Sequence, residues 1–325
     1  MFSFKCVFEE LSGPCQLCFS PDTNSIYYLA SGHVIAAIDY KTKEKIFIID
    51  LPAFIFELTV TQCGGFLLVG CGDNIGRVVD TKTKKMIALN GHTNTVRCII
   101  ECEDTDVLTC SDDTTIRRWN RLTGECIRTY TGHSDWIRSI IYDRKTNRIF
   151  SGSDDHTIIT LNAETGEQIG VMKGHSCCMT SLAFVNATTI VSGCADKTVK
   201  IWDITTMKEI KTMSSHTDWV RSIAVTPDRQ HVVSGSNDKT VKVWSIETGE
   251  CIETVSDIGD YVRNLQISQD GKYVFVSLYL GYKIYEIEPA FSCVVHKFNA
   301  QVGMEHCMLN LLSDGSIFNE KGEKI

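Results

Sequence analysis

The sequence contains little proline and no long apolar segment. Only 5 of its 325 residues are proline. No apolar run reaches the roughly 20 residues that a membrane-spanning helix needs. The first residues, MFSFKCVFEE, lack the charged start and the apolar core of a secretory signal peptide. We therefore expect neither a membrane segment nor secretion, and we predict a cytoplasmic or nuclear location, or both.

The sequence also lacks an excess of positive charge. It has 32 Lys and Arg residues against 40 Asp and Glu residues, which gives a formal net charge of −8. Nucleic acids and anionic membranes are bound through basic surfaces, so we expect neither as a partner. The 15 cysteines are an odd number, and many lie in apolar runs such as VRCII and HCMLNLL. We interpret them as reduced, buried small residues rather than as a disulfide framework.

Motifs that carry catalysis or bind metal ions are missing. The sequence has no phosphate-binding loop of the Walker type, no GxSxG elbow and no HExxH pair. Cys15 and Cys18 form one CxxC, but no second CxxC or spaced His pair completes a zinc site. We therefore expect no enzyme activity, no catalytic residue, no metal site and no cofactor.

What the sequence does contain is an internal repeat. SGSDDHTIITLNAETGEQIGVM, residues 151–172, and SGSNDKTVKVWSIETGECIETV, residues 234–255, are near copies of each other. Further copies, TCSDDTTIRRWNRLTGECIRTY and SGCADKTVKIWDITTMKEIKTM, start at Thr109 and Ser192. The four starts, at residues 109, 151, 192 and 234, are 41 or 42 residues apart. Such a period is typical of repeat architectures.

Fainter copies extend this array in both directions. They start at Ser25, Gly65 and Tyr273, and the last residues, LLSDGSIFNEKGEKI, resemble the end of one more unit. Within each unit, short alternating runs such as VRSIAVT and VKVWSI are separated by turn residues, which indicates antiparallel strands. One small sheet cannot bury both of its faces alone, so the units must stack on each other.

Units of this length, with Gly-His near the start and Trp-Asp near the end, resemble the repeats of the WD-repeat family. The resemblance implies an all-β fold: a single β-propeller over residues 1–325, built from four-stranded antiparallel blades. In such a propeller the N-terminal strand, here FSFKCVFEE, completes the last blade. From the number of copies we favour eight blades; seven is the alternative, if the segment after Phe298 is an irregular tail.

One set of polar residues recurs in the four clearest units. From the first Ser or Thr of each copy, an Asp follows at position +4 and a Trp at +10, and a His of the Gly-His pair precedes them. In WD-repeat proteins these residues form a hydrogen-bonded chain, so the resemblance implies a structural network rather than repeated catalytic triads. Its members are His92, Thr109, Asp113 and Trp119; His133, Ser151 and Asp155, with Leu161 at the Trp position; His175, Ser192, Asp196 and Trp202; and His216, Ser234, Asp238 and Trp244.

A second set of residues follows each Gly-His position. An Arg stands five residues after the His in three units, and an Arg stands at the matching place of a fourth. The remaining units have Thr180, Glu57 and Gln16 at this place by our alignment, and aromatic residues precede several of the Arg by two positions. The resemblance places these side chains on the top face, around the mouth of the central channel. The candidate partner-binding residues are Arg97, Trp136, Arg138, Trp219, Arg221, Tyr261 and Arg263.

Arg and aromatic residues dominate the energetics of protein interfaces, and the guanidinium group matches carboxylate or phosphate. These repeats resemble those of the substrate-receptor propellers of F-box ubiquitin ligases, in which Arg at this position bind phosphorylated peptides, although we find no F-box before the first strand. We therefore expect a scaffold that binds an acidic or phosphorylated peptide and is monomeric by itself. Two alternatives stay open. The protein is a structural subunit of a larger assembly that uses its rim or sides, or the Arg only pair with nearby carboxylates such as Asp112, Asp154 or Asp135.

Overall fold

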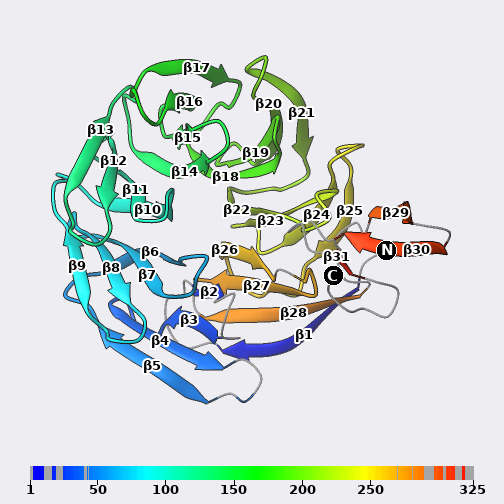
Figure 1. Cartoon of the computed structure of the whole chain (residues 1–325), viewed down its shortest axis with the longest axis horizontal. Coiled ribbons are helices and arrows are strands. Elements are labelled where there is room, and N and C mark those ends of the chain that lie inside the picture. Colours follow the sequence, from blue (N-terminus) through cyan, green and yellow to red (C-terminus); the bar gives the residue numbers. More distant parts are fainter. Residues whose placement is uncertain are drawn as a thin grey trace.

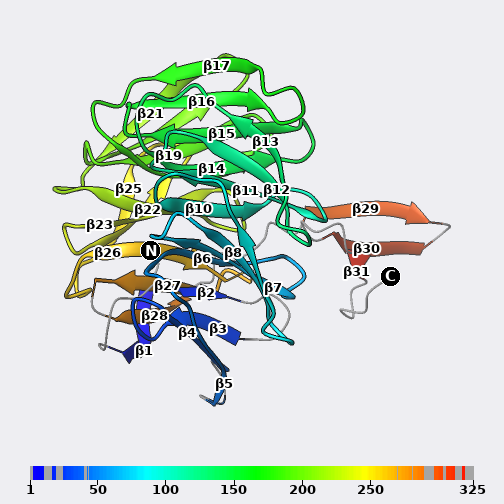
Figure 2. The ribbon, with the colours of Figure 1, turned by 90° about the vertical axis from the view of Figure 1, so that its left-hand side faces the viewer.

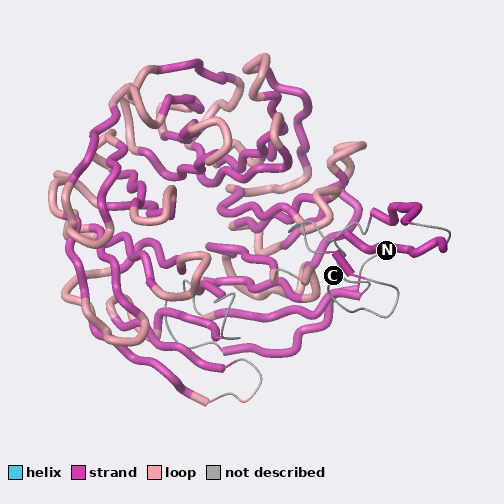
Figure 3. Tube along the Cα trace, in the orientation of Figure 1, coloured by secondary structure: helices cyan, strands magenta, loops and turns pink. Residues whose placement is uncertain are grey.

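The structure is a computed structural model, and it describes residues 3–10, 17–19, 25–39, 42, 44–268, 270–279, 281–288, 296–302, 305–311 and 317–318. Strands and connecting loops account for these residues, and none of them lies in a helix (Figure 3). The strands β1–β28 form seven four-stranded sheets, which are arranged as blades around a central axis (Figure 1). The described part of the chain is therefore a seven-bladed β-propeller.

The first four blades follow the chain in order, each from its inner to its outer strand. Blade 1 contains β2 (Leu17–Phe19), β3 (Ser25–Leu29), β4 (Val34–Asp39) and β5 (Lys45–Asp50). Blade 2 contains β6 (Ile55–Val60), β7 (Phe66–Cys71), β8 (Gly76–Asp80) and β9 (Met86–Leu89). Blade 3 contains β10 (Val96–Glu101), β11 (Asp106–Ser111), β12 (Ile116–Asn120) and β13 (Cys126–Tyr130). Blade 4 contains β14 (Ile137–Asp143), β15 (Arg148–Ser153), β16 (Thr157–Asn162) and β17 (Gln168–Lys173).

The remaining blades continue the same order until the last one, which uses both ends of the array. Blade 5 contains β18 (Met179–Asn186), β19 (Thr189–Cys194), β20 (Thr198–Asp203) and β21 (Lys208–Ser214). Blade 6 contains β22 (Val220–Val225), β23 (His231–Ser236), β24 (Val241–Ser245) and β25 (Cys251–Val255). Blade 7 contains β26 (Val262–Ile267), β27 (Tyr273–Leu278), β28 (Tyr282–Glu288) and, outside them, β1 (Ser3–Glu10).

The prediction of eight blades is wrong. It assigned the C-terminal residues to an eighth unit that the N-terminal strand would complete. Instead β1 pairs antiparallel with β28, from Ser3 opposite Glu288 to Glu10 opposite Tyr282. The seventh unit lacks an outer strand of its own, and β1 covers the edge of β28 that would otherwise be unpaired. The ring then closes without further strands, because β2 of blade 1 contacts β26 of blade 7.

The last described strands form a sheet of their own. β29 (His296–Val302), β30 (Glu305–Leu311) and β31 (Ile317–Phe318) pair with each other and with no propeller strand in the described part of the chain. Figure 2 shows β29 and β30 as a hairpin to the side of the blades. The C-terminal copy that suggested an eighth blade therefore has strands, but it is not a blade.

The core lies between neighbouring blades rather than within one of them. The second strand of blade 3, β11, is buried along its whole length, whereas the outer strand β13 is mostly exposed. A buried cluster joins Leu108 and Ile116 of blade 3 to Ile140 and Ile149 of blade 4. Since both faces of an inner sheet are covered by its neighbours, each blade depends on the next one for its burial. This continuous packing holds the start of every inner strand at the same end of the propeller.

The 12 cysteines whose side chains the structure describes are free. Five of them are buried, and Cys18, whose side chain is 1% exposed, belongs to the cluster between blades 1 and 2. Its CxxC partner Cys15 lies outside the described residues, so this candidate metal pair is not placed. In the described ranges no helix is long and apolar enough to cross a membrane.

Candidate functional site

The recurring polar residues meet inside their blades. In blade 5, Nδ1 of His175 lies 2.7 Å from a carboxylate oxygen of Asp196, and Nε2 lies 2.8 Å from the Ser192 hydroxyl. The indole N–H of Trp202 donates to the same hydroxyl over 2.7 Å. His175, Ser192 and Trp202 are all buried. The four side chains thus form one continuous chain of hydrogen bonds across the blade.

Blades 3 and 6 repeat this arrangement. The corresponding distances are 2.7 Å from His92 to Asp113, 2.7 Å from His92 to Thr109 and 2.8 Å from Trp119 to Thr109. In blade 6 His216 lies 2.7 Å from both Asp238 and Ser234, and Trp244 donates to Ser234 over 2.7 Å. We call these four-residue sets the tetrads. Each tetrad ties the loop before an inner strand to the turn between the second and third strands.

Blade 4 has only three members of a tetrad. His133 lies 2.7 Å from Asp155 and 2.9 Å from the Ser151 hydroxyl. Leu161, 2% exposed, occupies the place of the Trp. The Ser151 hydroxyl is 3.4 Å from the carbonyl oxygen of Ile159, to which it can donate. The missing indole is therefore replaced by apolar packing and by a contact to the backbone.

The tetrads hold their carboxylates in the ionised form. Burial by itself disfavours the charge of Asp238, but hydrogen bonds from His216 and Thr240 outweigh it and hold the pKa of Asp238 below its usual range. The balance is the same for Asp113 and Asp196, whose partners are His92 with Thr115 and His175 with Thr198. Since both nitrogens of each His are already hydrogen-bonded, the tetrads are suited to bracing loops.

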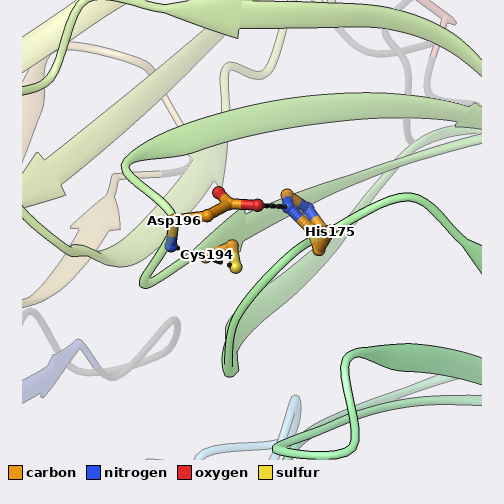
Figure 4. A group of neighbouring side chains, drawn as sticks. All are labelled: His175, Cys194 and Asp196. Carbon is orange, nitrogen blue, oxygen red and sulfur yellow. Dashed lines mark hydrogen bonds and ion pairs between the residues drawn. The ribbon is translucent and has the colours of Figure 1, made fainter.

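Blade 5 adds a cysteine to its tetrad. His175, Cys194 and Asp196 have potential ligand atoms within 4.8 Å of one another (Figure 4). However, the Cys194 thiol donates to the carbonyl of Cys177 over 3.2 Å and accepts from the amide of Asp196 over 3.3 Å. Ser111, Ser153 and Ser236 make the same two kinds of bond in blades 3, 4 and 6. Cys194 therefore acts as a replacement for serine in the turn.

The candidate Arg residues lie at the starts of the inner strands. Each occupies a β-bulge, where the register with the second strand shifts by one residue. The bulge residues are Arg97 in blade 3, Arg138 in blade 4, Thr180 in blade 5, Arg221 in blade 6 and Arg263 in blade 7. We use the name top face for the end of the propeller that carries these bulges.

The bulge of blade 2 corrects the sequence alignment. The register shifts between Ile55 and Glu57, so the bulge residue is Phe56, and Glu57 is one position too far. The Phe56 ring lies 4.5 Å from the Arg97 guanidinium and 5.2 Å from the ring of Phe54. Blade 2 therefore contributes aromatic side chains rather than a carboxylate to the top face. The corresponding residue assigned to blade 1, Gln16, lies outside the described residues.

Two of the four Arg are engaged in ion pairs within their own blades. Arg97 binds both carboxylate oxygens of Asp112, and its shortest contact is 2.6 Å. Arg138 binds Asp154 in the same way, over 2.9 and 2.6 Å. Trp136 lies between them, with the two guanidinium groups 5.5 and 4.9 Å from its ring. Asp135 instead accepts from the amide of Trp136.

The other two Arg have no carboxylate within ion-pair distance among the described residues. Arg221 donates to the Asn237 side-chain oxygen over 3.0 Å and stacks on Trp219 at 4.6 Å. Arg263 stacks on Tyr279 at 4.9 Å. Burial, then the positive charges of Arg263 and Arg138, lower the pKa of Arg221. Positive charge is thus concentrated over blades 6 and 7.

Exposed aromatic side chains accompany the Arg. Trp136 is 39% exposed, Trp219 40% and Tyr261 46%. Two more were missed from the sequence, Phe54 at 46% and Tyr279 at 51% exposure. Phe54 stands just before the first paired residue of its inner strand, as Trp136 and Trp219 do, so this offset was a signal that could have found it. Tyr279 follows the second strand, and no repeated motif marks it.

These features define a seven-bladed propeller with buried tetrads and a face rich in Arg and aromatic residues. The family model for the WD domain, G-beta repeat, matches residues 83–120, 124–159, 166–203 and 207–245. Together with the fold, these matches show that the chain is a WD40-repeat β-propeller. Propellers of this family are usually non-catalytic, and they typically serve as protein-interaction scaffolds.

Several curated proteins are similar to parts of the chain. An F-box protein of Saccharomyces cerevisiae is 37% identical over 151 residues, which are 44% of this chain and 23% of that protein. A guanine nucleotide-binding protein subunit beta-like protein of Encephalitozoon cuniculi is 26% identical over 48% of this chain and 36% of its own. A Lissencephaly-1 homolog of Caenorhabditis briggsae is 30% identical over 34% of this chain and 29% of its own. The matched part of the chain therefore spans between 23% and 36% of the length of these relatives.

Proposed function

We propose that this propeller is a non-catalytic scaffold whose top face binds a short acidic or phosphorylated peptide segment. The observation that carries the proposal is the stacking of Arg on exposed aromatic rings around one end of the propeller. Arg138 lies 4.9 Å from Trp136, Arg221 lies 4.6 Å from Trp219, and both rings are about two-fifths exposed. A stacked guanidinium group without a carboxylate partner, such as that of Arg221, keeps donors free for anionic oxygens, while the rings offer apolar contact area.

The distribution of charge supports a peptide of opposite sign. The whole chain has a net charge of −8, whereas the top face gathers four Arg. Asp112 and Asp154 neutralise two of them, and Arg221 and Arg263 supply the remaining positive charge. Such a local patch attracts an acidic segment and accelerates its association. The similarity to a protein named as an F-box protein is compatible with a role in binding other proteins. A cytoplasmic or nuclear place of action stays a prediction.

The non-catalytic part of the proposal follows from the tetrads. Their Ser, His and Asp side chains resemble hydrolase triads in composition, but the hydroxyl and the imidazole are buried in each of them. A substrate carbonyl has no access to a nucleophile in that position. Both imidazole nitrogens also have partners within the blade, which leaves no free base.

A second candidate function is that of a structural subunit that uses the rim of the propeller. Exposed aliphatic side chains recur on the outer strands of blades 1–6, about once in each blade. They are Ile46, Ile48, Met86, Ile127, Ile169, Ile210 and Ile252, with exposures between 40% and 54%. Partner subunits that pack on the rim would cover them. Single exposed apolar residues are common on protein surfaces, however, so the top face has the stronger support.

The proposal is tested by peptide binding. We expect a pool of acidic and phosphorylated peptides, measured by fluorescence anisotropy, to bind with an affinity that falls steeply as salt rises. The double variant Arg138→Ala with Arg221→Ala should lose this binding by about tenfold or more, chiefly because it removes the guanidinium of Arg221, which has no carboxylate in ion-pair distance among the described residues. The control is Lys145→Ala with Lys208→Ala, which removes the same charge from exposed residues elsewhere. Equal peptide affinity in the two double variants would show that the top face is not the binding site.

A further inference from the structure

The four Arg of the top face differ in the residue that lies beside each guanidinium group. In blades 3, 4, 6 and 7, the residue that follows the second strand lies next to the bulge residue. In blades 3 and 4 this residue is an Asp, which neutralises Arg97 and Arg138. In blade 6 it is Asn237, which accepts one hydrogen bond from Arg221 but carries no charge. In blade 7 it is Tyr279, whose ring lies 4.9 Å from the Arg263 guanidinium.

Blade 5 separates the two kinds of Arg. Its bulge residue Thr180 donates to the backbone carbonyl of Val220, and Ala195 follows its second strand. Neither residue adds charge to the face. The top face is thus divided into a neutral half over blades 3 and 4 and a positive half over blades 6 and 7.

The positive half is compensated only in part among the described residues: the charge of Asp218 favours the Arg221 guanidinium, but no carboxylate lies within ion-pair distance of Arg221 or Arg263. The two bulges are adjacent, because the Ser222 hydroxyl, next to Arg221, donates to the Asn264 side-chain oxygen, next to Arg263, over 3.1 Å. Burial and then the charge of Arg263 disfavour the charged form of Arg221. Aromatic faces stabilise the two groups only in part, because a cation–π contact is weaker than an ion pair with a desolvated carboxylate. An anion placed between the two groups would relieve their repulsion and accept hydrogen bonds from both.

We propose that Arg221 and Arg263 form the anion subsite of the top face, and that it takes the phosphoryl group of a phosphorylated side chain in a peptide. A phosphoryl group carries nearly two negative charges and three acceptor oxygens, which match two unpaired guanidinium groups better than one carboxylate does. Trp219, Tyr261 and Tyr279 border this subsite, and all three are exposed enough to contact the flanking residues of the peptide.

This inference deepens the proposed function and rests on it. Under it Asn237 is the residue that keeps the subsite open, because an Asp in its place would pair with Arg221 as Asp154 pairs with Arg138. Arg97 and Arg138 contribute little to binding, since a ligand would have to displace a carboxylate that already holds each of them through two bonds.

The experiment uses the full chain and three degenerate peptide pools with fixed central phosphoserine, glutamate or serine. We expect the phosphoserine pool to bind at least about tenfold more tightly than either of the others. Asn237→Asp and Arg263→Gln should each weaken its binding by about tenfold or more, while Arg97→Gln changes it less than about twofold. Gln230→Glu adds the same charge as Asn237→Asp at an exposed turn at the opposite end of blade 6, and should leave binding unchanged.

The outcomes separate the inference from the proposed function. Loss of binding in Arg97→Gln but not in Asn237→Asp or Arg263→Gln would overturn the subsite and keep the top face as the binding site. Equal binding of the glutamate and phosphoserine pools would overturn the phosphoryl assignment. Absence of binding by all pools to the unsubstituted chain would overturn the proposed function itself. All the substitutions are at partly exposed or exposed residues, so we expect each variant to keep the unfolding temperature of the unsubstituted chain. Thermal unfolding of each variant therefore distinguishes a loss of binding from a loss of fold.

Discussion

Blades 6 and 2 have the same four-stranded fold but different centres. In blade 6 the centre is polar, with His216 and Trp244 joined through one serine hydroxyl. In blade 2 the strand registers place Val69 and Val79 at the positions of the Ser and the Trp. Leu51 stands four residues before the first paired residue, Ile55, as His216 stands before Val220. These three side chains are at most 2% exposed. The comparison shows that a blade needs a filled centre without unpaired polar groups. A hydrogen-bonded tetrad and a set of apolar side chains both meet this requirement.

The acidic residue of the tetrad is kept in both blades, with a different partner. Asp238 of blade 6 lies 2.7 Å from His216, whereas Asp73 of blade 2 binds Arg77 over 2.8 and 2.5 Å. In both blades the carboxylate also faces the turn that joins the second and third strands. The turn therefore requires a carboxylate as hydrogen-bond acceptor, and the side chain that donates to this carboxylate is His in one blade and Arg in the other.

Low pH should destabilise the blades that contain tetrads before it destabilises blade 2. We expect this to be the largest of the predicted effects. The folded-state pKa values of Asp113, Asp155, Asp196 and Asp238 are lowered, because hydrogen bonds from His and Thr outweigh the desolvation of each carboxylate. Such groups stabilise the fold above the unfolded pKa of about 3.9, and this contribution is lost as the pH falls below it. Blade 2 has one such carboxylate, Asp73, whose pKa is lowered by its hydrogen bond from Arg77, but the apolar centre formed by Leu51, Val69 and Val79 does not depend on it.

The measurement is hydrogen exchange at pH 6 and pH 3, with rates corrected for intrinsic pH dependence. Amides of β10–β25 should lose protection at pH 3 before those of β6–β8. The urea unfolding free energy over the same range supplies a second measurement. A stability that does not change between pH 6 and pH 3, or earlier loss of protection in blade 2, would contradict the role given to the tetrads.

A substitution at the Trp position tests the comparison within a single blade. Trp244→Ala removes a fully buried indole and leaves a cavity, so we expect a loss of about 3–5 kcal/mol in the unfolding free energy. Trp244→Leu reproduces the residue that blade 4 has at Leu161, and should cost about half as much. Urea denaturation measures both. Equal losses would show that the hydrogen bond to Ser234, rather than the filled volume, carries the stability.

The smallest expected effect is at the serine-like cysteine of blade 5. Cys194→Ser introduces the residue that blades 3, 4 and 6 have in this turn, where its hydroxyl donates over 2.9–3.0 Å. Because a hydroxyl is a stronger donor than a thiol, we expect a gain of about 0.5–1 kcal/mol. Thermal unfolding measures it, with the exposed Cys63→Ser as the control that should change nothing. Destabilisation by Cys194→Ser would mean that the site is built for sulfur.

The features that the sequence predicts well are those that repeat at constant spacing. The tetrad residues were found because Thr109, Ser151, Ser192 and Ser234 start four copies of one pattern. In every copy the Asp follows at +4, and the His precedes by 17 or 18 residues. The possible pairing of Arg with nearby acids was also visible, since Asp112 and Asp154 stand just before the tetrad Asp in their own turns.

Features that depend on long-range pairing were not predicted. The blade count was wrong because nothing local in FSFKCVFEE says whether its partner is β28 or a later strand. Glu57 was taken for the bulge residue instead of Phe56 because blade 2 has no Gly-His pair from which to count. In blades 3 to 6 the His before the inner strand marks the place of the same bulge. Tyr279 was missed because its role arises from its position beside Arg263, 16 residues away in the chain.

The amino-acid pattern alone determined that the chain is a stack of small sheets with polar braces at their centres, because each brace is encoded within a single repeat. How many sheets close the circle, and which cations remain without a counter-ion, were decided only in three dimensions. Both depend on contacts between segments that no repeat contains: the edge that the first strand covers, and the neighbour that faces each guanidinium.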